Sequence, residues 1–148
     1  MKTDLVVAGY IIHDDKVLLI HHKKLNLWLP VGGHIEKDET PDEAMLREAK
    51  EEVGIDIEIL NKKDLPFDKN VKKNLATPFH VNVHSAGDHN HCCFFYLCSC
   101  KNKELEINLN EVNSFQWFSK EDLNDEKVPL DVKHIALKAF EIYSKQSL

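Results

Sequence analysis

Three closely spaced glutamates, Glu48, Glu51 and Glu52, are the residues of this sequence best suited to chemistry. They follow Arg47 in a segment of helical type, which places their carboxylates within about one turn of each other. Like charges at this spacing repel and mildly destabilise a helix. A hard divalent cation such as Mg²⁺ offsets the repulsion, because it binds carboxylate oxygens and is held in part by substrate phosphates. The spacing therefore predicts a metal site, with an ordinary solvated acidic face as the alternative.

The helix that carries these glutamates has recognisable ends. Thr40 can cap it, Pro41 suits its first position, and Glu43 completes a capping box. Apolar residues recur on one face at helical spacing, and Gly54 fits the left-handed residue that ends a helix. We therefore expect a helix from Pro41 to about Val53, with an apolar face on the core and an acidic rim.

A glycine pair, Gly32 and Gly33, follows Pro30 and leads into this helix. Glycine has no Cβ, so the backbone here can bend sharply or approach a ligand closely. We expect the acidic face of the helix to lie beside a bend at this pair.

Segments of β type surround the helix and must build the sheet that positions it. Apolar runs and alternating patterns predict strands at residues 5–13, 16–22, 55–60, 79–84, 91–100 and 114–118. The first two predict a hairpin, and 91–100 is apolar on both faces, which favours a central strand. Residues 129–144 predict an amphipathic helix that covers the sheet, and Ser119 offers a cap for a short helix before it.

Length and charge limit the classes of protein. The 148 residues fit one domain, and we expect a single domain over 1–148. The net charge of −6 argues against non-specific nucleic-acid binding and against an anionic membrane surface. Four cysteines in one apolar run indicate buried thiols in a reducing compartment, so we expect a cytoplasmic protein. Self-association as a homodimer stays open.

The Nudix box, G-x5-E-x7-R-E-U-x-E-E-x-G-U with U a bulky or aliphatic residue, is matched by Gly33, Glu39, Arg47, Glu48, Glu51, Glu52, Gly54 and Ile55. All defined positions fit, although Ala49 is small for its U position. Asp38 stands where many members have glycine, and Asp tolerates the left-handed conformation better than most residues. The sequence thus resembles the Nudix hydrolases, in particular the small MutT-like members.

This resemblance implies an α/β fold, the Nudix α/β/α sandwich with a mixed β-sheet flanked by helices. It also implies that the protein hydrolyses a nucleoside diphosphate linked to another group, with Mg²⁺ or Mn²⁺ as cofactor. Glu48, Glu51 and Glu52 match the acidic metal positions of the family, and the carbonyl of Gly32 matches a frequent backbone ligand. Such a cation neutralises the pyrophosphate and lowers the pKa of a bound water.

The residue that accepts the proton of this water varies within the family. Glu48 is one candidate, and Glu111, six residues before Trp117, is a candidate outside the box, with an exposed loop carboxylate as its alternative. Arg47 and Glu39 are expected to support the geometry, as are the box glycines Gly33 and Gly54. Arg47 lies one helical turn from Glu43 and Glu51 and can fork to a carboxylate.

Substrate contacts are predicted at four residues outside the box. They are His80, Asn82, His91 and Trp28, and each has core or surface packing as its alternative. Trp117 is expected either to stack on a base of the substrate or to pack in the core or at its rim. The loop at 61–78 carries Lys62, Lys63, Lys69, Lys72 and Lys73, which could attract a polyphosphate or simply be solvated.

The sequence offers a second candidate metal centre in His89, His91 and the four cysteines, Cys92, Cys93, Cys98 and Cys100. These residues include no C-x2-C or H-x3-H pair, and neighbouring residues of a strand point to opposite faces. We therefore expect no stoichiometric zinc in the protein.

The leading hypothesis is a pyrophosphohydrolase of a small nucleotide-type substrate, with a (deoxy)nucleoside triphosphate as first choice. The motifs that mark the NADH and coenzyme A hydrolases of the family are absent. The alternatives are a Nudix-fold sensor that binds a nucleotide without turnover and an isomerase of prenyl diphosphates on the same fold.

Overall fold

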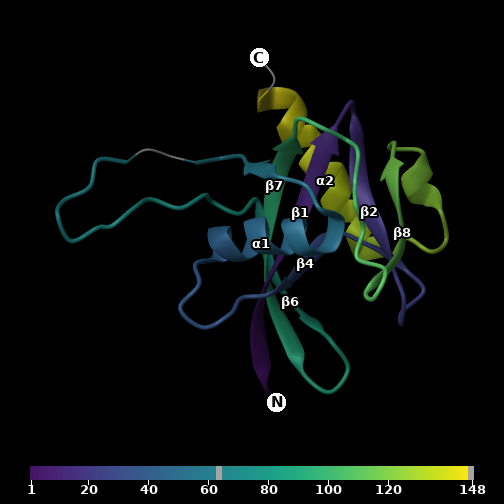
Figure 1. Cartoon of the computed structure of the whole chain (residues 1–148), viewed down its shortest axis with the longest axis horizontal. Coiled ribbons are helices and arrows are strands. Elements are labelled where there is room, and N and C mark those ends of the chain that lie inside the picture. The colour runs from purple at the N-terminus through teal and green to yellow at the C-terminus, as the bar shows by residue number, and fades with distance from the viewer. Residues whose placement is uncertain (63–64, 147–148) are drawn as a thin grey trace.

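The computed structural model describes residues 1–62 and 65–146, which form a mixed β-sheet with one long helix on each face (Figure 1). Eight strands are assigned in these residues: β1 Thr3–His13, β2 Lys16–His22, β3 Trp28–Leu29, β4 Val31–His34, β5 Ile57–Ile59, β6 His80–Ser85, β7 Asn90–Cys100 and β8 Val112–Phe118. The helices are α1 Pro41–Val53, α2 Leu130–Gln146 and the short 3-10 helix η1 Asp122–Asn124. This arrangement confirms the α/β/α sandwich.

Strand pairing makes the sheet mixed. The order is β3-β2-β1-β7-β5, with β4 added to β1, β6 to β7 and β8 to β2. β1 pairs in parallel with β7, whereas the other strand pairs are antiparallel. β7 is hydrogen-bonded to β1, β5 and β6, which confirms the central strand expected from its two apolar faces.

The side chains of β1 alternate between two hydrophobic cores. Val7 and Ile11 pack in the core beneath α1, together with Met45 of that helix. Tyr10 and other residues of the opposite face pack in the core beneath α2, where Phe140 is buried. Each helix is therefore fixed to its own face of one sheet.

The ends of α1 agree with the sequence signals. Thr40 Oγ1 accepts the backbone N–H of Glu43, and the Glu43 carboxylate accepts the N–H of Thr40, so the capping box is complete. Gly54 has φ 70° and donates its N–H to the carbonyl of Lys50. Asp38 has φ 64°, the left-handed conformation expected of it.

The glycine pair corrects one expectation. Gly32 and Gly33 lie within the extended strand β4, and neither has a positive φ, so no bend occurs there. A Cβ at Gly32 would overlap the carbonyl of Val7 on β1, and a Cβ at Gly33 would overlap the carboxylate of Glu48. The pair is needed for close approach rather than for a turn.

Residues 61–62 and 65–78, between β5 and β6, belong to a long loop that projects away from the sheet (Figure 1). The base of the loop is closed by a bridge between Lys62 and Ala76, and Ala76 donates its N–H to Asp42 of α1. Lys63, one of the five loop lysines that could attract a polyphosphate, lies outside the described residues. Within 1–62 and 65–146, no helix has the length and apolar character needed to cross a membrane.

Candidate active site

Glu52 is the buried end of the acidic cluster, with only 7% of its surface exposed. Its Oε1 accepts the backbone N–H of Gly32 at 2.9 Å, which joins α1 to β4. The neighbouring Gly33 leaves room for the carboxylate of Glu48, which a Cβ at this position would overlap. Glu51, at the other end of the cluster, has a side chain that is 58% exposed. The exposure of the carboxylates therefore differs along the expected acidic rim.

Arg47 organises the rest of the cluster. Its Nε and Nη2 bind both oxygens of Glu39 at 2.7 and 3.0 Å, which is a bidentate fork. Its Nη1 contacts Glu48 at 2.8 Å and Glu51 at 3.2 Å. Nη2 also donates to the carbonyl of His34 on β4 at 2.9 Å. One guanidinium thus holds the start of the box, the helix and the strand together.

This geometry settles the partner of the guanidinium fork. The sequence left it open between Glu43 and Glu51, but Glu43 is engaged in the helix cap and Glu51 receives a single contact. The fork is made to Glu39, eight residues before Arg47, which no helical spacing indicates.

Burial and mutual repulsion change the acidity of the carboxyl groups. The pKa of Glu52 is raised to about 8, mainly by burial and in smaller part by the charges of Glu48, Glu111 and Glu51, while the hydrogen bond from Gly32 opposes the shift. Burial also raises the pKa of Glu48, although Arg47 opposes the shift. By contrast, the hydrogen bond from Arg47 lowers the pKa of Glu39.

These observations test whether the residues fit a divalent cation. Glu48, Glu51 and Glu52 present carboxylates along one side of α1, and Arg47 is the one guanidinium in contact with the cluster, where it is shared with Glu39. Clustered carboxylates with raised pKa values are the environment that a hard cation stabilises. Glu48, Glu51 and Glu52 therefore fit a divalent metal, and a contribution from the Gly32 carbonyl stays a prediction.

Glu111 lies immediately before β8 and is exposed. The segment is held near the end of α1, because Asn108 donates its N–H to the carbonyl of Glu52 at 2.9 Å. The negative charge of Glu111 contributes to the raised pKa values of both Glu48 and Glu52. The structure thus brings this carboxylate near the box, and its role as a base stays a prediction.

A cavity of about 250 Å³ opens beside Glu52, which is one of its lining residues. Gly32 and Gly33 form part of its wall, and the far side comes from α2 through Asp131 and apolar neighbours. Tyr10 is another lining residue, and its hydroxyl is fully buried and, among the described residues, without a hydrogen-bond partner. An unpaired buried hydroxyl in a cavity wall suits a hydrogen bond to a ligand.

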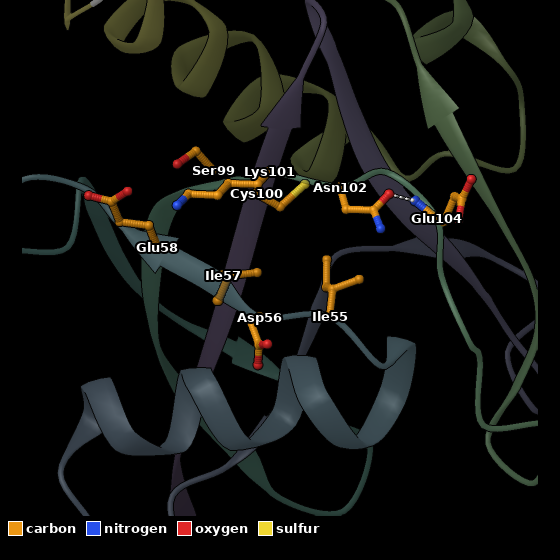
Figure 2. A pocket seen from close by; sticks show the side chains of 9 residues that line it. All are labelled: Ile55, Asp56, Ile57, Glu58, Ser99, Cys100, Lys101, Asn102 and Glu104. Carbon is orange, nitrogen blue, oxygen red and sulfur yellow. Dashed lines mark hydrogen bonds between the residues drawn. The ribbon is translucent and has the colours of Figure 1, made fainter.

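A larger hollow of about 510 Å³ lies elsewhere, between residues 55–58 and 99–104 (Figure 2). Its wall includes Asp56, Glu58 and Lys101, and no glutamate of the box lines it. A third hollow of about 670 Å³ is larger still, and its wall includes His13, Lys103 and Trp117 but no glutamate of the box. Size alone would favour these two hollows, but the acidic cluster places the candidate active site at the smaller cavity beside Glu52.

The four predicted substrate residues are separated by the structure. His91 lines the cavity, whereas the cavity wall does not include His80, Asn82 or Trp28. Asn82 instead contacts the ring of His84 through its side-chain oxygen at 3.0 Å. Trp28 packs on Phe118 and His21, with ring centroids 5.1 Å apart in both pairs.

Residues missed from the sequence also line this cavity. They are Tyr10, His22, His34, His84 and Asp131. Tyr10 stands in an apolar run that predicts only a strand, and its access to the cavity depends on which face of β1 meets α2. The alternate spacing of His80, Asn82 and His84 indicates that their side chains share one face of a strand, and this pattern could have pointed to His84. Of the three, His84 alone lines the cavity.

The four cysteines lie on β7, outside the acidic cluster of α1. All four thiols are free, and Cys93 and Cys98 are buried. Burial raises the pKa of Cys93 to about 12, so this thiol stays protonated and unreactive at neutral pH.

Known proteins resemble this chain in sequence and in fold. The profile of the NUDIX domain family matches residues 3–138. The crystal structure of a NUDIX family hydrolase from Clostridium perfringens is 34% identical, superposes with a TM-score of 0.83, and the match covers 97% of this chain and 99% of that one.

Two curated relatives match over a shorter segment. The CTP pyrophosphohydrolase of Escherichia coli (strain K12) is 40% identical over 60 residues, which are 38% of this chain and 44% of the relative. The RNA pyrophosphohydrolase of Marinomonas sp. (strain MWYL1) is 41% identical over 60 residues, 37% of each. The match spans less than half the length of either relative.

Proposed function

Since this chain belongs to the Nudix family, we propose that it is a Mg²⁺- or Mn²⁺-dependent pyrophosphohydrolase that cleaves a nucleoside diphosphate linked to another group. The observation that carries the proposal is the position of Glu52. This glutamate belongs to the acidic cluster of α1 and also lines the cavity, so a metal-bound phosphate chain at the cluster adjoins a recess for another part of the substrate.

The residues around the cluster have separable tasks. A bound cation supplies charge neutralisation of the pyrophosphate and a more acidic water. Arg47 holds Glu48 and Glu51 in place, and the Gly32 N–H orients the carboxylate of Glu52. Glu48 is the proposed proton acceptor, since burial raises its pKa and so makes it a better base.

The cavity receives the nucleoside or the other leaving part of the substrate. Its 250 Å³ lies below the roughly 300–1,000 Å³ of sites that hold a whole drug-sized ligand, so one ring system fits better than a complete nucleotide. Apolar side chains such as Val132 and Ile135 suit a flat ring, and Tyr10 with His91 offers polar contacts.

A nucleoside triphosphate is the proposed first substrate. The two curated relatives act, by their names, on CTP and on RNA, and both names describe pyrophosphate hydrolysis. We extend only this reaction class to the present chain, together with a small nucleotide-type partner and a cytoplasmic location, which the free thiols favour.

A phosphate-release panel tests the proposal. Purified protein is assayed with Mg²⁺ and with Mn²⁺ on nucleoside triphosphates, 5′-triphosphorylated RNA, nucleoside diphosphate sugars, ADP-ribose and dinucleoside polyphosphates. We expect metal-dependent turnover of at least one class, and its abolition by a chelator. Nucleotide binding without turnover anywhere in the panel would instead identify a sensor and contradict the proposal.

A further inference from the structure

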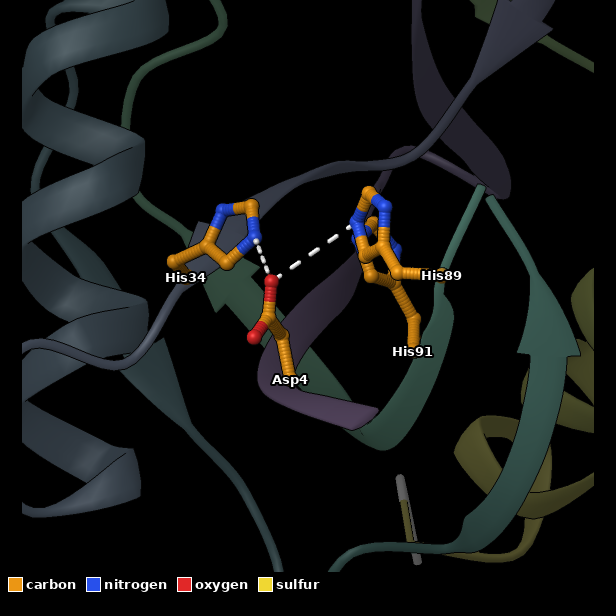
Figure 3. A group of neighbouring side chains, drawn as sticks. All are labelled: Asp4, His34, His89 and His91. Carbon is orange, nitrogen blue, oxygen red and sulfur yellow. Dashed lines mark hydrogen bonds and ion pairs between the residues drawn. The ribbon is translucent and has the colours of Figure 1, made fainter. Parts of the chain in front are cut away.

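Four metal-binding side chains meet at one end of the sheet, outside the glutamate cluster (Figure 3). They are Asp4 of β1, His34 of β4, His89 just before β7 and His91 of β7. Each offers one ligand atom, and these atoms all lie within 4.8 Å of one another. None of the four stands at a defined position of the Nudix box, although His34 and His91 also line the cavity beside Glu52.

Strand pairing, rather than sequence proximity, brings the four together. Asp4 is the direct partner of His91 in the parallel pairing of β1 with β7. His34 is the partner of Val6 in the antiparallel pairing of β1 with β4, two residues along β1 from Asp4. Backbone hydrogen bonds of the central sheet therefore hold the group in place.

Three of the six separations between the ligand atoms are close to the edge of a tetrahedron around a small cation, and the other three lie within 4.8 Å. With metal–nitrogen bonds of about 2.0–2.1 Å, the edge of a tetrahedral site is about 3.3 Å. Asp4 Oδ2 lies 3.3 Å from His34 Nε2 and 3.6 Å from His89 Nε2. His89 Nε2 lies 3.1 Å from His91 Nε2.

Neighbouring charges orient two of the ligands. Asp88 contacts His89 Nδ1 at 2.7 Å, which fixes the ring and leaves Nε2 directed at the group. Lys2 lies 3.3 Å from Oδ1 of Asp4, so the other oxygen, Oδ2, faces the histidines. Carboxylate partners of this kind are the usual outer contacts of metal-binding histidines.

We propose that Asp4, His34, His89 and His91 form a second metal site, which binds a transition-metal cation of the Zn²⁺ type. This site departs from the sequence expectation of no stoichiometric zinc, because Asp4 and His34, which that expectation did not include, are brought to His91 by strand pairing. Three imidazoles and one carboxylate favour Zn²⁺ over Mg²⁺, which prefers oxygen ligands. Four protein ligands complete a tetrahedral coordination, the arrangement of a structural rather than a catalytic zinc. The side chain of His34 is 57% exposed, which gives the ion a path from solvent.

Such an ion ties β1, β4 and β7 together beside the active site. His34 follows Gly33 directly, and its carbonyl accepts the 2.9 Å hydrogen bond from Arg47. Metal binding at the histidines therefore stabilises β4, which adjoins Glu48 at Gly33 and donates a hydrogen bond to Glu52 from Gly32. The two proposed metal sites share no ligand.

Metal retention tests the site. Protein purified without a histidine tag is stripped with a chelator, mixed with Zn²⁺ in the presence of excess Mg²⁺ to occupy the glutamates, desalted and analysed for metal. We expect about one zinc per chain and a higher Tm with zinc than without, because an ion that binds only the folded state stabilises it. Less than a tenth of an equivalent would overturn the proposal.

Two matched double variants locate the ion. His89→Ala with His91→Ala should lose the bound zinc and the Tm increase, whereas His80→Ala with His134→Ala removes as many imidazoles elsewhere and should retain both. Equal zinc in the two variants would overturn the assignment. If the first pair does not fold, Asp4→Asn and His34→Gln each replace one ligand and should each weaken retention at least tenfold.

X-ray absorption on zinc-loaded wild-type protein gives a test that needs no variant. We expect a shell of nitrogen and oxygen at about 2.0–2.1 Å. A sulfur shell at about 2.3 Å would place a cysteine in the site and contradict the proposal.

Discussion

Gly32 donates its backbone N–H to Oε1 of Glu52 over 2.9 Å, and this hydrogen bond joins β4 to the buried end of the acidic cluster. The carboxylate is consequently fixed before any cation or substrate arrives. Replacing it with an amide of the same shape changes its charge while leaving the packing of α1 intact.

Glu52→Gln should therefore reduce Mg²⁺-dependent turnover on the order of 100-fold or more, because it removes a proposed metal-binding oxygen anion. Circular dichroism should stay close to wild type, because the amide keeps the shape of the carboxyl group. Turnover within twofold of wild type would remove Glu52 from the metal site. Glu58→Gln, on β5 and outside the box, is the matched control and should have no effect.

The same substitution should change how stability depends on pH in chelated protein. The pKa of Glu52 is about 8 in the folded state against 4.5 for an ordinary glutamate, so between these values the folded state holds a proton that the unfolded state has lost. Stability then falls as pH rises, by at most about 1.4 kcal/mol per pH unit.

Urea midpoints of wild type and Glu52→Gln, measured at several pH values in chelator, check this prediction. The amide cannot ionise, so the variant should gain on wild type between about pH 4.5 and 8 and then keep a constant advantage. Added Mg²⁺ should stabilise wild type most at the alkaline end. A difference between the two proteins that is independent of pH would mean that Glu52 titrates normally.

Gly33→Ala should inactivate the enzyme through contact alone. The new Cβ would overlap the carboxylate of Glu48, so this side chain must move away from its position beside Arg47. We expect a loss of turnover on the order of 100-fold, with retained binding of nucleotide. Gly87→Ala is the control for turnover, since nothing lies within 4 Å of a Cβ there. Its φ of 93° strains an alanine, so this variant should lose stability while keeping its turnover. Equal turnover in both variants would contradict the prediction.

Glu111→Gln distinguishes a catalytic carboxylate from a surface one. If Glu111 accepts a proton during hydrolysis, kcat should fall about 10²-fold or more while KM changes little. The pH profile should also lose its acidic limb. Glu104→Gln, an exposed carboxylate on the segment that precedes β8, gives the baseline. An unchanged kcat would make Glu111 an ordinary loop residue.

Tyr10→Phe separates ligand binding from folding. The hydroxyl is buried without a described partner, so its removal should leave stability unchanged or raise it by about 1 kcal/mol. If the hydroxyl binds the substrate, KM should rise several-fold with little change in kcat. Lower stability with an unchanged KM would show that it has a structural partner instead. Tyr96→Phe, buried on β7 in the other core, is the control.

Local signals made the acidic helix predictable. The cap at Thr40, the left-handed Gly54 and the spacing of the glutamates all depend on neighbours within a few residues, and each is found as expected. The central position of β7 was predictable for a similar reason, because a strand with two apolar faces needs cover on both.

The contacts that could not be predicted from the sequence depend on which residues of neighbouring strands and helices face each other. No spacing rule indicates that Gly32 meets Glu52 or that Glu39 receives the fork of Arg47. The histidine cluster shows the same limit. His89 and His91 were considered together with nearby cysteines, whereas the structure groups them with Asp4, which β1 brings from the far end of the sequence.

The parallel pairing of β1 with β7 also decides when the chain can fold. Residues 3–12 pair with residues 90–99, so the centre of the sheet cannot close until most of the chain has left the ribosome. Contacts between such distant segments form slowly, and meanwhile the apolar run of β1 stays exposed to other chains. Yield during synthesis should therefore be sensitive to substitutions in β7, even where these spare the finished enzyme.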